Sequence, residues 1–117
     1  MEATGTVVSV LKALADPVRL SILEFLWGPV AEEFRTGDGI CAGDIGDFLG
    51  VSQPTVSYHM TILINAGLVK AEKQGQRVYY ECITEGPDEV IRYLERYREP
   101  NPANPFAREE VERWRPA

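Results

Sequence analysis

The sequence predicts a single, mainly α-helical domain that carries one β-hairpin. Three observations indicate this fold class. Apolar residues recur at helical spacing along most of the chain, glycine or proline interrupts these stretches, and an alternating segment lies near residues 68–83. A length of 117 residues corresponds to one domain, and a content of 44% hydrophobic and 26% charged residues suffices for a modest core.

Two helices are predicted at the N-terminal end of the chain. Apolar spacing from Val7 predicts the first helix over residues 7–15, which ends there because the residue before a proline disfavours α geometry. Asp16 is a suitable N-cap for a second helix, and Pro17 is a suitable first residue. This second helix is predicted to end at Gly28.

A short helix and a longer helix follow a polar connection over residues 29–39, in which we expect one helical turn. The short helix is predicted over residues 42–49, and Gly50 is a typical C-terminal stop. Ser52 is a good N-cap for the next helix, which is predicted to run to about Ala66. Because so few residues separate the two helices, the turn between them is tight.

The longer helix, over residues 52–66, has two chemically different faces. Apolar residues at i, i+4 and i+7 predict a core side formed by Val56, Met60 and Leu63. The opposite side is uncharged, aromatic and capable of hydrogen bonding. It consists of Ser57, Tyr58, Thr61 and Asn65.

A hairpin and a further helix complete the predicted domain over residues 1–99. The strands are expected near residues 68–72 and 77–83, joined by a loop at residues 74–76, and the helix over residues 87–98. This order of elements is that of a winged helix-turn-helix, in which the second helix of the motif enters a DNA major groove.

Residues 100–117 are predicted to form a Pro-rich linker and a short C-terminal helix. Ala107, Val111 and Trp114 share one side of that helix. Because a large apolar side chain such as Trp114 is unusual on a free tail, we expect the helix to pack on the body or on a partner subunit.

Four sequence motifs resemble the ArsR family of bacterial transcriptional regulators. They occur in the order and spacing of that family, over about residues 7–97. The motifs are LADPVRLSIL at residues 14–23, VSQPTVSYHM at 51–60, NAGLV at 65–69 and GQRVYY at 75–80.

The resemblance implies a homodimer that binds a double-stranded DNA operator, typically as a repressor released by an effector. We expect helix 52–66 to enter the major groove and the wing at residues 73–77 to reach the backbone or minor groove. The effector is left open. The first and last core helices are expected to form the dimer interface, through Val7, Leu11, Leu14, Ile91 and Leu94.

The candidate DNA-contacting residues belong to the predicted recognition helix and the wing. The polar helix residues also suit a merely solvated face, and cations beside a turn often serve only solubility. His59 lies at the edge of the core face, so it is expected either to pack or to touch a phosphate. The candidates are Ser52, Gln53, Thr55, Ser57, Tyr58, His59, Thr61, Lys73 and Arg77.

The distribution of charge permits DNA binding although the net charge is −6. Residues 1–50 hold 3 Lys+Arg and 8 Asp+Glu, a net charge of −5. Residues 51–83 hold 3 and 2, a net charge of +1, and residues 84–117 hold 6 and 8, a net charge of −2. An anionic polymer is therefore steered toward the middle of the chain.

The cysteines and the single histidine limit metal and redox chemistry. Metal-sensing ArsR proteins carry a cysteine pair where this chain has Cys41 but Gly43, so half of that site is missing. Cys41, at a helix start, is a possible redox thiol, although a small packed residue is the simpler interpretation. Cys82 is expected to pack. We therefore expect no bound metal and no cofactor, with a metal- or thiol-responsive sensor as the alternative.

Other function classes find little support in the sequence. No nucleophile has a plausible base and no glycine loop could cradle a phosphate, so we expect no enzyme. No apolar run reaches the roughly 18 residues of a membrane span, and we expect a cytoplasmic protein. The alternative from another class is a winged-helix module that binds a protein partner and no DNA.

Overall fold

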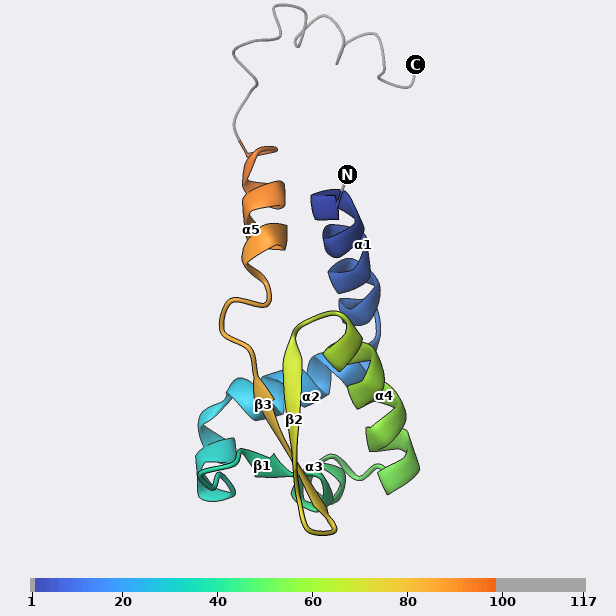
Figure 1. The fold of residues 1–117 in the computed structure, drawn as a ribbon, viewed down its shortest axis with the longest axis vertical. Coiled ribbons are helices and arrows are strands. Elements are labelled where there is room, and N and C mark those ends of the chain that lie inside the picture. Colours follow the sequence, from blue (N-terminus) through green and yellow to red (C-terminus); the bar gives the residue numbers. More distant parts are fainter. Residues whose placement is uncertain (1, 99–117) are drawn as a thin grey trace, which may run out of the picture.

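The computed structural model describes residues 2–98, and its elements follow the order of a winged helix-turn-helix (Figure 1). The predicted mainly helical fold with a hairpin wing is confirmed. The predicted linker and helix over residues 100–117 lie outside the described residues. The elements are α1 (Glu2–Leu14), α2 (Pro17–Trp27), the 3-10 helix η1 (Pro29–Glu33), β1 (Ile40–Cys41), α3 (Ala42–Leu49), α4 (Gln53–Asn65), β2 (Val69–Gln74), β3 (Arg77–Cys82) and α5 (Asp88–Glu95).

Two helix ends differ from the sequence expectation. α1 begins at Glu2, five residues before Val7, because apolar spacing marks only the turns that pack and not the polar first turn. α5 ends at Glu95 instead of Arg98. There the backbone tightens, since the N–H of Arg98 donates to the carbonyl of Glu95, three residues back, at 3.0 Å.

One core joins the helices to the sheet. α2, α3 and α4 pack on one another and on the strands, while α5 lies beside α1 at the other end of the molecule (Figure 1). Because α4 shares its buried side chains with this core, its orientation is set by tertiary packing. The largest fully buried side chains are Val10, Ile22, Leu26, Ile40, Ile45, Val56, Met60, Leu63 and Val69.

The sheet has three antiparallel strands in the order β1-β3-β2. β1 was not predicted, because two residues are too short to show alternation. It is defined by its partner strand, with Ile40 opposite Tyr80. The hairpin loop is shorter than predicted: Gln74 pairs with Arg77, so the turn contains two residues, and Gly75 adopts the left-handed φ of 64°.

The helix-turn-helix is held by local hydrogen bonds at both helix ends. α3 stops at Gly50, whose φ of 70° favours glycine, and the N–H of Val51 donates to the carbonyl of Gly46 at 3.0 Å. Ser52 caps α4 by accepting from the N–H of Thr55 at 3.4 Å. The predicted short helix, tight turn and capped helix are therefore confirmed.

Candidate nucleic-acid interface

α4 turns an apolar face to the core and a polar face to solvent. Val56, Met60 and Leu63 are buried, as the spacing predicts. Tyr58 is 64% exposed, and the hydroxyl of Thr61 donates to the carbonyl of Ser57 at 3.0 Å. This exposed face carries hydroxyl groups that can donate to or accept from base edges. Its members are Ser57, Tyr58, Thr61 and Asn65.

The first turn of α4 is engaged in contacts within the protein. The hydroxyls of Ser52 and Thr55 hydrogen-bond each other at 2.9 Å. The side-chain amide of Gln53 donates through Nε2 to the carbonyl of Ala42 at 3.1 Å, which ties the start of α4 to the start of α3. Bidentate recognition of adenine by Gln53 therefore requires its amide to leave Ala42.

His59 lies beneath the exposed face and not on it. His59 is only 8% exposed, and its Nδ1 lies 3.1 Å from a guanidinium nitrogen of Arg19. Its ring meets that of the exposed Tyr58 edge-on, with the centroids 5.0 Å apart. Of the two sequence expectations for His59, the structure favours packing. His59 is not part of the exposed contact surface.

Arg19 is the residue of this region to which the sequence assigned no role. It is 9% exposed, and its Nε donates to the carbonyl of Ala13 at 2.6 Å. Asp16 caps α2 beside it and accepts from the N–H groups of Val18 and Arg19. The hydrogen bond from Arg19 holds the pKa of Asp16 below its ordinary value. The only indication of this role in the sequence is that an arginine follows Val18 in a helix that packs on the core.

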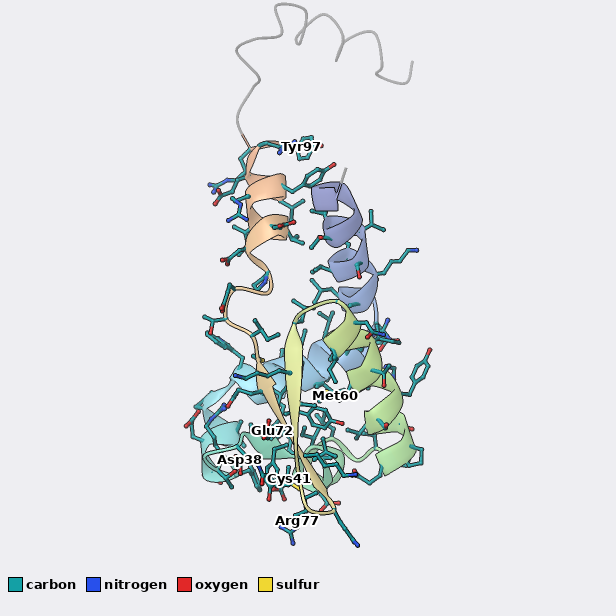
Figure 2. The ribbon with its side chains drawn as sticks, in the orientation of Figure 1. Asp38, Cys41, Met60, Glu72, Arg77 and Tyr97 are labelled. Atoms are coloured by element: carbon teal, nitrogen blue, oxygen red, sulfur yellow. The ribbon has the colours of Figure 1, made fainter. Side chains whose placement is uncertain are left out.

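The wing presents the two predicted cations at its tip. Lys73 and Arg77 are both exposed, and Figure 2 shows Arg77 at the end of the hairpin. The wing tip and the N-terminal end of α4 lie at the same end of the molecule (Figure 1). The first turn of α4 and the wing cations therefore lie at one end of the molecule.

A partly buried arginine network anchors the strand that carries the wing. Arg35 donates to Glu32 at 2.9 Å, to Glu81 on β3, and to the carbonyl of Leu26 at 3.1 Å. The hydrogen bond to Glu81 raises the pKa of Arg35, so the guanidinium stays charged. This network links the end of α2 to β3, away from α4.

The predicted dimer residues divide between the core and the surface. Val7 is 3% exposed within one protomer, so it has little area to lose on association. Leu14 is half-buried. Ile91 and Leu94 are each 49% exposed, and Leu11 is also exposed. The sequence reasoning missed the exposed apolar residues Val8 and Tyr97.

Within residues 2–98 both cysteines are free thiols, and neither belongs to a metal site. Cys41 is the N-cap residue of α3 and makes no side-chain capping bond. Burial raises the pKa of the Cys82 thiol, with Glu81 adding to the effect. Among the described residues no three His, Cys, Asp or Glu side chains gather as a metal site. No described helix is long and apolar enough to cross a bilayer.

The comparisons with known proteins agree with this geometry. The profile of a helix-turn-helix domain family matches residues 14–72. An HTH-type transcriptional regulator of Methanocaldococcus jannaschii is 36% identical over 95 residues, which cover 81% of this chain and 98% of that protein. The transcriptional repressor SdpR of Bacillus subtilis is 34% identical over 86 residues, which cover 74% of this chain and 86% of that protein.

A solved structure matches the fold as well. It is the solution structure of a homodimeric winged helix-turn-helix DNA-binding domain from Mycobacterium bovis, described as a possible ArsR-family regulator. It is 28% identical, with a TM-score of 0.58, and the match covers 81% of this chain and 82% of that one. The chain is therefore a member of the ArsR family of DNA-binding transcriptional regulators, which are not enzymes.

Proposed function

We propose that the protein represses transcription as a homodimer that places its two α4 helices in successive major grooves of an operator. The observation that supports this most directly is the exposed, uncharged, hydroxyl-rich face of α4 beside the wing cations. An uncharged face suits base recognition, because it reads hydrogen-bonding patterns without binding every phosphate alike.

Two copies are required because one short recognition helix makes few base contacts. A two-fold axis doubles them and demands two half-sites about one helical turn apart. Exposed apolar residues on α1 and α5, at the end opposite the wing, suit such an axis (Figure 2). The Mycobacterium bovis domain is homodimeric, and the Bacillus subtilis relative is a repressor, which supports the same assignment.

We assign sequence discrimination to Ser57, Tyr58 and Thr61, with Gln53 joining them only if its amide leaves Ala42. Lys73 and Arg77 contribute charge to the wing and attract phosphates of any sequence. The remaining acidic surface lowers background binding to random DNA. Affinity and specificity therefore reside in different elements.

The test begins by selecting an operator from random duplexes with the wild-type protein. Fluorescence anisotropy then measures affinity for operator and for random DNA at several salt concentrations. Ser57→Ala and Tyr58→Ala should weaken operator binding about tenfold with little effect on random DNA, since a base contact contributes about 1–3 kcal/mol of discrimination. Arg77→Ala should weaken both and lower the salt slope by about one.

Arg98→Ala is the matched control for Arg77→Ala. It removes the same charge from an exposed position that follows α5, at the end of the molecule opposite the wing (Figure 1), so it should leave affinity and salt slope unchanged. If Ser57→Ala and Tyr58→Ala leave the ratio of operator to random affinity unchanged, α4 is not the reader. Failure to select any duplex would favour a module that binds a protein partner.

A further inference from the structure

A buried arginine connects three helices under the polar face of α4. Arg19, on α2, donates through Nε to the carbonyl of Ala13 at 2.6 Å and through Nη2 to the carbonyl of Lys12 at 3.3 Å. Both carbonyls belong to the C-terminal end of α1. Its Nη1 lies 3.1 Å from Nδ1 of His59, in the middle of α4. One guanidinium therefore joins α1 to α4.

The chemistry of this contact defines the form of His59. A guanidinium has only donors, so Nδ1 of His59 must be the acceptor. The ring is then neutral and carries its proton on Nε2. Protonation of Nδ1 would set two donors and two positive charges against each other at 3.1 Å. The bond exists only with the neutral ring.

We propose that Arg19 is a positioning residue for operator binding, a role that rests on the homodimer proposed above. By holding neutral His59 it fixes the orientation of α4 relative to α1, which carries part of the proposed dimer face. The distance between the two α4 helices of a dimer then depends on this joint. Arg19 thereby sets how strictly the protein requires one spacing between half-sites.

The groups around His59 act in opposite directions when the ring is protonated. Arg19 repels the imidazolium, whereas Oδ1 of Asp16, 3.9 Å from Nδ1, attracts it. Tyr58 makes a T-shaped ring contact with His59, with the centroids 5.0 Å apart. Arg19 is therefore the group that hydrogen-bonds the ring, while Asp16 lies beyond hydrogen-bonding distance.

The first experiment measures spacing tolerance. Wild-type protein should lose affinity about tenfold or more when one base pair is inserted between the half-sites of the selected operator. Arg19→Lys, which cannot serve His59 and both α1 carbonyls at once, should lose less than about threefold on the same insertion. Arg35→Lys is the matched control: it weakens another arginine network, which is partly buried and lies away from α4, and it should keep the wild-type penalty.

The second experiment uses the fact that His59 is the only histidine in the sequence. His59→Phe removes the acceptor, so it should reduce the one-base-pair spacing penalty as Arg19→Lys does. His59→Asn keeps an acceptor near the position of Nδ1, so it should keep the wild-type spacing penalty. Nitrogen-15 NMR of the wild type should show Nδ1 unprotonated at pH 7.5.

Three results overturn the proposal: wild-type spacing discrimination in Arg19→Lys, loss of that discrimination in His59→Asn, or a proton on Nδ1 at pH 7.5. The NMR measurement needs neither DNA nor a variant that folds. If the wild type selects no operator, the proposed function fails. Amide exchange in α4, faster in Arg19→Lys than in Arg35→Lys, then still decides whether Arg19 holds this helix.

Discussion

Gly46 lies where α3 meets the turn of the helix-turn-helix, and Gly46→Ala should damage that junction. A Cβ at this position would lie 2.9 Å from the carbonyl oxygen of Val51 and would clash with Nε2 of Gln53. The Gln53 amide can rotate away, but the Val51 oxygen is backbone, and it belongs to the residue whose N–H bonds the Gly46 carbonyl at 3.0 Å. The turn itself has to move.

The expected cost follows from that geometry. Overpacking costs about 1–3 kcal/mol, and losing the Val51 hydrogen bond adds about 0.5–1.5 kcal/mol. Each kcal/mol lowers Tm by about 4–8 °C in a domain of roughly this size. Operator affinity should fall too, because the angle between α3 and α4 changes. Urea unfolding followed by circular dichroism at 25 °C measures the stability change directly.

Gly43→Ala is the matched control, because it makes the same substitution in the same helix. The nearest atom to its Cβ is Sγ of Cys41 at 4.0 Å, so the alanine fits. It should stabilise the protein by up to about 1 kcal/mol through helix propensity. The double variant with Gln53→Ala should stay destabilised, since the Val51 contact remains. Equal stabilities for Gly46→Ala and Gly43→Ala would refute this reasoning.

Three further predictions concern acid stability, association and the C-terminal segment. Backbone N–H groups lower the pKa of Asp16 in the folded chain. The stability that its carboxylate contributes is therefore present above the unfolded pKa near 3.8 and is lost as pH falls through the lower folded pKa. Asp16→Asn keeps a cap but does not titrate, so the dependence of Tm on pH should be flatter over that interval. Leu94→Glu should convert a dimer to a particle near 13.1 kDa in light scattering, and a wild type already of that mass would contradict the proposed dimer. Truncation after Pro100 should lower Tm or weaken dimerisation if Trp114 packs as expected, and no change in either would contradict it.

Local chemistry made most of the fold predictable from the sequence. Asp16 and Ser52 cap helices through their own side chains, and Gly50 ends one through its own backbone. These effects act within three or four residues, so they can be read along the chain. The spacing of apolar residues likewise identified the buried and exposed faces of α4, so the polar face of the candidate interface could be predicted from the sequence.

Tertiary packing decided the features that depend on residues distant in the sequence. Arg19 and His59 are 40 residues apart, and nothing near either one indicates their contact. β1 exists only because β3 pairs with it, and Val7 is buried instead of exposed because the rest of the core covers it. The sequence by itself determined the order of the main elements, the capped ends of α2, α3 and α4, and which face of α4 is polar. Only the folded chain decided what holds that face in place, because long-range contacts depend on the whole core and not on local hydrogen bonding.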